Sequence, residues 1–253
     1  MITVATWNVN GIRAREAQYL EWVEQNRPDV ICLQEIKASP GQIPEAVMAM
    51  EGYWSYWHGA AGGYSGVSLQ LRRERFPEEP VFSHPAFDHE TRIVQGRVGD
   101  LVFASVYIPN GGKDYDAKLA FMRAVPGYVE GLHASGLGVL LCGDMNVART
   151  DADIHPTHNK PGIIGTRPDE RALMEDIFAR DMVDVARMLD PDNNRLFTWW
   201  PFWRSARERN LGWRIDYIVA SGKIARHATD CVIFKDVGGS DHAPVMATFD
   251  ITP

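Results

Sequence analysis

The chain has 253 residues, of which 45% are hydrophobic and 23% are charged, and its formal net charge is −7. This composition is typical of a globular protein with a large core, and the acidic balance counts against non-specific nucleic-acid binding through a basic surface. The three cysteines, Cys32, Cys142 and Cys231, have no Cys-x-x-Cys spacing. That pattern argues against a disulfide framework or a cysteine-rich zinc site and indicates buried free thiols.

The beginning of the chain has neither a basic region nor an apolar segment of the kind found in signal peptides. No apolar run is long enough to span a bilayer. We therefore expect a cytoplasmic protein with no membrane partner. Because there is no repeat, low-complexity tract or linker-like shift in composition, residues 1–253 are expected to form a single domain.

Hydrophobic patterning in the first half of the chain predicts alternating strands and helices. The expected strands cover residues 2–6, 30–34, 53–58, 67–71, 92–98 and 101–107. A helix over residues 13–25 separates the first two strands, and a short helix is expected over 44–50. This strand–helix–strand order is typical of an α/β fold.

The second half continues the same alternation. Residues 114–133 have helical spacing, although Pro126 should kink or divide that helix, and 169–180 predict another. Residues 181–189 fit a short helix or an extended piece. The remaining strands are expected over 138–142, 215–219, 228–234 and 245–249. Between two of these elements, residues 148–167 predict a long irregular loop, and loops of that length are often functional.

Polar side chains stand at the ends of many of the predicted strands. The set is Asn8, Glu35, Tyr107, Asp144, Asn146, Asp216, Asp241 and His242. If the strands stack as two face-to-face sheets, one edge of the sandwich can gather all of these groups. Several carboxylates with no cysteine and one histidine indicate a hard cation, Mg²⁺ or Mn²⁺. Such a site suits the hydrolysis of phosphate esters.

Each of these residues also has an ordinary structural alternative. Asp144 and Asn146 fit a turn, and Glu35 could pair with Lys37 on the surface. Asp216 lies between apolar residues of a strand, and a buried carboxylate needs a partner, which favours a functional role. The other histidines have no comparable setting and are expected on the surface or in loops: His58, His84, His89, His133, His155, His158 and His227.

Six motifs of the chain resemble the successive signatures of the exonuclease III family of abasic-site (AP) endonucleases. They cover residues 7–13, 33–37, 106–111, 142–147, 212–217 and 239–244, in the family's order. The resemblance implies a four-layer α/β sandwich, in which two face-to-face mixed β-sheets are flanked by helices. It also implies Mg²⁺-dependent cleavage of double-stranded DNA on the 5′ side of abasic sites, with exonuclease and phosphatase or phosphodiesterase activity at 3′ ends, by a monomer.

The resemblance also implies roles for the residues at the strand ends. Glu35 would bind the metal, with Asn8 and Asp241 close by. Asp144, held by Asn146, would orient or deprotonate the attacking water, and both residues are candidates for the metal site as well. The family leaves open which group is the base and whether one or two metal ions act.

Three further residues would act on the scissile phosphate. His242 would contact it, oriented by Asp216 as a His–Asp pair. Tyr107 would donate a hydrogen bond to the same phosphate or stabilise it electrostatically.

Residues 197–213 match the part of the family that holds the flipped-out sugar. Trp199 and Trp213 correspond to its pocket, and Trp203 to an apolar wedge in the minor groove. Lys113 matches a second DNA-probing position. Positive charge for the DNA phosphates would come from Arg204, Arg207, Arg209 and Arg214. The structural alternative is a tryptophan-rich core segment with a solvated basic loop.

Two other functions remain open from the sequence. One is a phosphoesterase of the same superfamily that acts on RNA or on a small phosphorylated substrate. The other is a non-enzymatic nucleic-acid-binding module, which would be expected to lack some of the eight strand-end residues, and none is missing. The aromatic and arginine-rich segment over 199–213 favours the DNA-repair nuclease, although residues 149–166 match no family pattern and leave substrate preference open.

Overall fold

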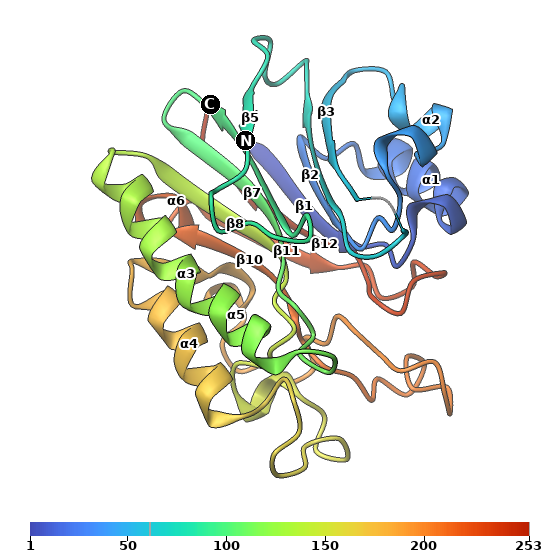
Figure 1. The fold of residues 1–253 in the computed structure, drawn as a ribbon, viewed down its shortest axis with the longest axis vertical. Coiled ribbons are helices and arrows are strands. Elements are labelled where there is room, and N and C mark those ends of the chain that lie inside the picture. The colour runs from blue at the N-terminus through green and yellow to red at the C-terminus, as the bar shows by residue number, and fades with distance from the viewer. Residues whose placement is uncertain (61, 253) are drawn as a thin grey trace.

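The computed structural model describes residues 1–60 and 62–252 and has two six-stranded β-sheets packed face to face, with helices on both outer sides (Figure 1). The expected four-layer α/β sandwich is therefore confirmed. Each sheet contains one parallel pair of strands among antiparallel pairs, so both sheets are mixed.

The first sheet combines four strands from the beginning of the chain with two from its end. Its order is β11 (Ala228–Ile233), β12 (Val245–Phe249), β1 (Ile2–Asn8), β2 (Val30–Gln34), β4 (Val67–Arg72) and β3 (Tyr53–His58). Strands β1 and β2 run parallel, so their carboxyl ends meet at the same edge of the sheet. This edge carries Asn8 and, immediately after β2, Glu35.

The second sheet comes from the middle of the chain. Its order is β5 (Val81–Ser83), β6 (Ile93–Val98), β7 (Leu101–Tyr107), β8 (Gly138–Asp144), β10 (Asp216–Ser221) and β9 (Met182–Asp184). Strands β7 and β8 are the parallel pair. The long helix between them makes that parallel connection possible, because two parallel strands cannot be joined by a tight turn.

The helices lie on the outer faces of the sandwich (Figure 1). Aromatic residues of α1 (Glu16–Asn26) pack against Trp7 of β1, and α2 (Glu45–Met48) lies on the same side. Apolar residues of α3 (Tyr115–Ala134) and α4 (Pro168–Phe178) cover the second sheet. Two short helices, α5 (Val185–Leu189) and α6 (Gly222–Ala225), and three 3₁₀ turns, Ile12–Ala14, Pro40–Gln42 and Asp151–Asp153, complete the described elements.

The core between the sheets is apolar and is crossed by a polar contact. Alternate residues such as Val4 and Leu69 of the first sheet meet Phe103 and Leu140 of the second. Among them, Gln34 Nε2 donates to Ser105 Oγ at 3.1 Å, which links the two sheets below the rim. Because buried polar groups need partners, this pairing favours a single relative placement of the sheets.

Some expected elements differ from the observed ones. Helix α3 continues through Pro126 and is not divided there. Proline removes the hydrogen bond to the carbonyl of Met122, but residue 126 is buried, and packing offsets that loss. Residues 181–189 were expected to form either a short helix or an extended piece, and they form strand β9 followed by helix α5. The short elements β5 and α6 were not expected. Within the described residues, no helix combines the length and apolarity needed to cross a bilayer.

Candidate active site

Strand register brings three of the predicted residues into one row. Tyr107 of β7 is paired with Asp144 of β8, and Asp144 is paired with Asp216 of β10. Residues paired across neighbouring strands point to the same face of a sheet. All three side chains therefore emerge together at the rim where the two sheets meet.

Asn8 joins the two sheets at this rim. Its Nδ2 donates to Glu35 Oε1 at 3.0 Å and to Asp144 Oδ2 at 2.9 Å. Glu35 also lies 2.7 Å from Lys37 Nζ, so the surface pair considered from the sequence exists beside the site contact. Burial alone raises the pKa of Glu35, but the hydrogen bonds from Asn8 and Lys37 and the charge of His242 lower it below its ordinary value.

Glu35 adopts a backbone conformation that is unusual for a residue with a side chain. Its φ is +48°, in the left-handed region, and Asn146 has φ +50°. Such conformations cost roughly 1–3 kcal/mol and concentrate at functional sites. Here they turn the chain sharply after β2 and after β8, which directs both side chains into the rim.

Asp144 is a deeply enclosed carboxylate, with 1% of its surface exposed. Its Oδ1 accepts from the backbone N–H of Asn146 at 2.9 Å. Asn146 Nδ2 in turn donates to the carbonyl of Ile108 at 2.9 Å. Burial raises the pKa of Asp144 to about 7, and the charges of Asp216 and Glu35 contribute to the rise while His242 opposes it. A carboxyl tuned in this way can accept a proton near neutral pH.

His242 and Asp216 form a buried pair. The Nδ1 of His242 lies 2.9 Å from Asp216 Oδ2, and Thr198 Oγ1 donates to the same oxygen at 2.6 Å. Burial alone lowers the pKa of His242, but the facing carboxylates of Asp216 and Asp144 raise it to about 10. The imidazole is therefore positively charged at neutral pH, and its Nε2 lies 3.9 Å from Asp144.

Asp241 is placed differently from its neighbour in the sequence. Its Oδ1 accepts from Asn10 Nδ2 at 2.8 Å and its Oδ2 from Trp199 Nε1 at 2.9 Å. Burial raises the pKa of Asp241, but His242, Trp199 and Asn10 together lower it. Both oxygens thus have protein partners, and Asp241 links the rim to the tryptophan-bearing segment.

Tyr107 stays protonated because of its surroundings. Burial raises the pKa of Tyr107, and the charges of Glu35 and Asp144 raise it further. Its ring lies 4.8 Å from the guanidinium of Arg92, whose Nη2 donates to the Tyr64 hydroxyl at 2.9 Å. Lys113 lies over the ring of Tyr64 at 5.6 Å. Neither Tyr64 nor Arg92 was predicted as a site residue; the available signals were a tyrosine in a glycine-rich loop and an arginine at the start of a strand.

The rim opens into a cavity of about 410 Å³. It is lined by Glu35, Tyr107, Asn110, Asp144, Asn146, Ile163, Ile164, Trp199, Trp213, Ile215, Asp241 and His242. Six of the eight strand-end residues line it directly, and the two that do not are Asn8 and Asp216. Ile163 and Ile164 belong to the long loop over 148–167, so that loop contributes to the site.

A second cavity of about 430 Å³ adjoins the first through Ile163, Trp199 and Trp213, which line both. Its wall also includes Trp203 and Arg204. Trp203 is 62% exposed and thus free to contact another molecule. Trp199 and Trp213 therefore stand where the two cavities adjoin, and Trp203 lies in the wall of the second.

Two arginines of this segment have protein partners. Arg214 is 1% exposed and bonds Asp153 and Asp184, so the expectation that it charges the DNA-facing surface is wrong. A guanidinium placed in the core needs such carboxylate partners. Arg207 donates to the carbonyls of Ser240 and His242 at 2.7 and 3.2 Å, which ties the segment to the loop that carries His242.

A buried lysine behind the rim was not recognised from the sequence. Lys118 Nζ donates to the Asn146 carbonyl at 2.8 Å and to the Asn110 carbonyl at 3.3 Å. It also pairs with Glu170 at 2.5 Å, and neither side chain is exposed to solvent. The signal available in the sequence was weak, because a lysine among apolar helix residues usually reaches the surface.

The chemistry of the donors fits a divalent metal. Glu35, Asp144 and His242 each offer one ligand atom, and these atoms lie within 4.8 Å of one another. Two carboxylates beside the amide of Asn146 form an oxygen-rich set suited to a hard cation. The positively charged, Asp216-bound His242 is a poor ligand in this state, which leaves the carboxylates as the principal donors.

Comparisons with known proteins agree with this geometry. The Endonuclease/Exonuclease/phosphatase family matches residues 5–242. An exodeoxyribonuclease of Bacillus subtilis is 33% identical over 97% of this chain and 98% of its own length.

Two solved structures have closely similar folds. An AP endonuclease from Archaeoglobus fulgidus superposes with a TM-score of 0.89 at 29% identity, over 99% of this chain and all of the other. A 3′ phosphatase from Neisseria, solved with a product DNA hairpin, gives a TM-score of 0.90 at 28% identity over the same shares. The chain therefore belongs to the Endonuclease/Exonuclease/phosphatase family, as a hydrolytic nuclease of the exonuclease III type.

Proposed function

We propose that the protein hydrolyses the phosphodiester on the 5′ side of abasic sites in double-stranded DNA and also processes 3′ ends. The observation that carries this proposal is the cavity in which the rim of carboxylates and His242 meets Trp199 and Trp213, with a second cavity adjoining it at these tryptophans. A pocket walled by tryptophans beside a phosphate-cleaving centre suits a sugar without its base. All these residues come from one chain, so a monomer suffices.

Mg²⁺ is the proposed cofactor, and Mn²⁺ would be accepted by the same donors. Glu35 would hold the ion, with Asp144 and Asn146 beside it, while Asn8 fixes the two carboxylates and Asp241 lies at the edge of the group. When bound, the ion supplies a positive charge that stabilises the oxygens of the scissile phosphate.

The chain's own residues would carry the proton transfers. Asp144, held by Asn146, would accept a proton from the attacking water. His242, kept charged and oriented by Asp216, would donate a hydrogen bond to a phosphate oxygen. Tyr107 would donate to the same group. These donors are preorganised by burial, which makes their stabilisation of developing charge more effective than in water.

The second cavity and its rim would bind the DNA around the lesion. Trp199 and Trp213 would enclose the extruded sugar, and exposed Trp203 would enter the minor groove as a wedge. Arg204 and Lys113 would contact phosphates, with a smaller share from Arg207 because its donors are partly used by backbone carbonyls. These contacts would position the DNA, while the pocket would select the lesion.

The decisive experiment is incubation with a labelled duplex that carries one stable abasic analogue, in Mg²⁺ and in EDTA. The wild-type protein is expected to cut the strand 5′ to the lesion only with Mg²⁺. Glu35→Gln should weaken Mg²⁺ binding, and Asp144→Asn should slow cleavage by roughly a thousandfold or more, because each removes a charge used in the reaction.

The controls separate this function from its alternatives. The exposed substitution Asp236→Asn should leave cleavage unchanged. The same assay is run with undamaged duplex, with RNA and with a small phosphate monoester. Faster turnover of RNA or of the small ester than of abasic DNA would replace the proposal with the alternative phosphoesterase.

A further inference from the structure

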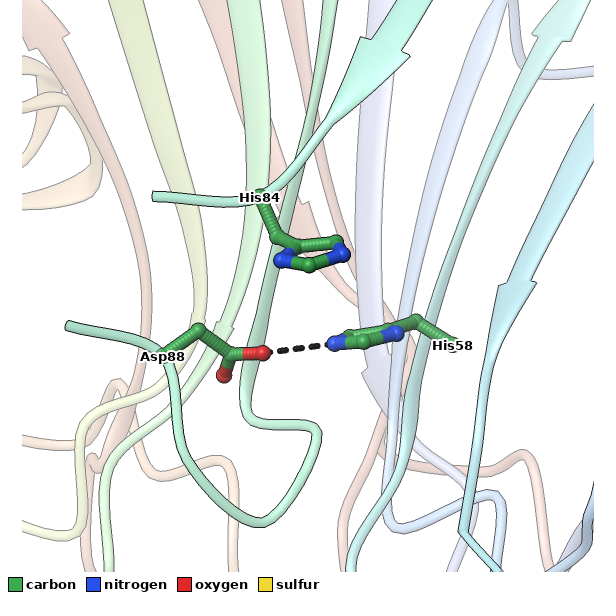
Figure 2. Close-up of side chains that lie close together, drawn as sticks. All are labelled: His58, His84 and Asp88. Carbon is green, nitrogen blue, oxygen red and sulfur yellow. Dashed lines mark hydrogen bonds and ion pairs between the residues drawn. The ribbon is translucent and has the colours of Figure 1, made fainter. Parts of the chain in front are cut away.

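Two histidines that the sequence suggested to be ordinary surface residues meet a carboxylate in the folded protein. His58 is the last residue of β3, while His84 and Asp88 lie on the segment that follows β5. His58 Nε2 is 2.6 Å from Asp88 Oδ2, and the rings of His58 and His84 stack with their centroids 4.5 Å apart (Figure 2). One ligand atom from each residue lies within 4.8 Å of the other two.

The Asp88 carboxylate is fixed by the backbone in a way that leaves one oxygen for this cluster. Its Oδ1 accepts from the N–H groups of Arg92 at 2.8 Å and Ile93 at 3.1 Å. Its Oδ2 contacts His58. The backbone thus fixes this carboxylate with its second oxygen facing the two imidazoles.

We propose that His58, His84 and Asp88 form a second metal site, specific for Zn²⁺ or a similar borderline transition-metal ion. Two imidazoles and one carboxylate are a donor set that Zn²⁺ prefers, whereas Mg²⁺ prefers oxygen ligands. Ligands of a tetrahedral Zn²⁺ ion lie about 3.3 Å apart, given Zn–N and Zn–O distances near 2 Å. The His58–Asp88 contact needs to open slightly to admit the ion.

His84 is the residue that can move to complete the site. It is exposed, whereas His58 and Asp88 are partly enclosed. In Figure 2 its ring lies over His58 with one nitrogen on the side of the Asp88 carboxylate, so a tilt of the ring directs that nitrogen toward the ion. A site with three protein ligands leaves the fourth position to water.

A metal ion at this position would stabilise the packing of the two sheets. Strand β3 is at the edge of the first sheet and β5 is at the edge of the second, so the ion would cross-link the two sheets. Just beside it, Tyr56 of β3 and Phe82 of β5 already stack across the same gap. The cluster also adjoins Arg92, whose carbonyl accepts from the Tyr107 N–H at 2.7 Å. Zn²⁺ would thus stabilise the side of the sandwich that supports Tyr107.

The test measures metal binding directly. Metal-free wild-type protein, His84→Gln and His89→Gln are dialysed against Zn²⁺, and bound metal is counted. His84→Gln removes a proposed ligand without loss of bulk, while His89→Gln changes a nearby exposed histidine outside the cluster. Wild type and His89→Gln are expected to bind one Zn²⁺ more than His84→Gln, or to bind it at least about tenfold more tightly.

Two further measurements distinguish this site from the catalytic rim. Co²⁺ should give tetrahedral d–d absorption that survives Glu35→Gln and disappears in both His84→Gln and His58→Gln. Zn²⁺ should raise the melting temperature of wild type more than that of His84→Gln. If His84→Gln keeps wild-type stoichiometry and affinity, or if the extra ion is lost only with Glu35→Gln, the second site does not exist.

Discussion

At the scale of single residues, the rim brings buried carboxylates and a buried imidazole close together. Asp144 and His242 both have raised pKa values, the first because burial disfavours its anion and the second because two carboxylates face its ring. Coulomb interactions are stronger where water is excluded. Small changes of charge at the rim should therefore have large effects on protonation.

Asp216→Asn tests this balance. The substitution removes the negative charge closest to the imidazole, so the pKa of His242 is expected to fall from about 10 toward its ordinary value of 6.5. NMR titration of the His242 ring proton in the metal-free protein measures the change. An unchanged titration would show that Asp216 does not control the charge of His242.

The same substitution should change how stability depends on pH. Because folding raises the pKa of His242, its charged form stabilises the native state fully below pH 6.5, and this contribution is lost as the pH rises through about 10. Between these values the free energy of unfolding should fall less steeply in Asp216→Asn than in wild type. Asp236→Asn, at an exposed position, serves as the control.

At the scale of elements, close packing of strands and helices determines where the site residues stand. A Cβ at Gly143 would lie 1.8 Å from the carbonyl oxygen of Val106, so only glycine lets β7 and β8 approach at that level. The next residue in β8 is Asp144, paired with Tyr107. Glycine at this position therefore permits the strand pairing that aligns Tyr107, Asp144 and Asp216.

The buried pair Lys118–Glu170 joins α3 to α4 in a similar way. Lys118→Met would leave Glu170 without its cation in a place that water does not reach. Removing one partner of a buried pair costs about 3–5 kcal/mol, and urea denaturation should show a loss of that size. Burial also lowers the pKa of Lys118, and the charge of Glu170 opposes that shift.

A matched control lies on the surface of the same two helices. Glu130 of α3 and Arg180, just after α4, pair at 3.0 Å with both side chains substantially exposed. Glu130→Gln should change the free energy of unfolding by no more than about 1 kcal/mol. Equal losses in Lys118→Met and Glu130→Gln would mean that burial does not set the strength of the inner pair.

At the scale of the whole molecule, the rim of carboxylates and the tryptophan-lined surface lie beside two distinct, adjoining cavities. The net charge is −7, so affinity for DNA must come from a local surface and should be modest and sensitive to salt. Exposed Trp203 lies on that surface, in the wall of the second cavity. It lies outside the set of residues that line the catalytic cavity.

Trp203→Ala should therefore weaken binding to abasic duplex more than it slows single-turnover cleavage at saturating protein. Loss of a stacked or inserted aromatic ring typically costs about 1–3 kcal/mol of binding. Fluorescence anisotropy and rapid-quench kinetics separate the two effects. Phe202→Ala removes the neighbouring exposed aromatic side chain, so its effects on affinity and on the cleavage rate are compared with those of Trp203→Ala. A slower chemical step with unchanged affinity would contradict the wedge assignment.

Much of the fold and of the candidate site was predictable because it depends on local patterns. Strands such as β1 and β2 follow from short apolar runs, and the residue that ends each run must lie at a sheet edge. Asn8, Glu35, Tyr107 and Asp144 were identified in this way. Helix α3 was predicted, but it is not divided at Pro126, because sequence spacing does not report the packing that offsets a lost hydrogen bond.

The sequence by itself determined which polar groups stand at strand ends and in what order, since alternation along a strand is a short-range property. Only the tertiary structure decided which of them meet, and it also decided the burial of Arg214, the Lys118–Glu170 pair and the approach of His84 to Asp88. Those contacts join segments distant in the chain. They depend on how two sheets and their helices pack, and that packing is set by the sum of many weak interactions rather than by any one motif.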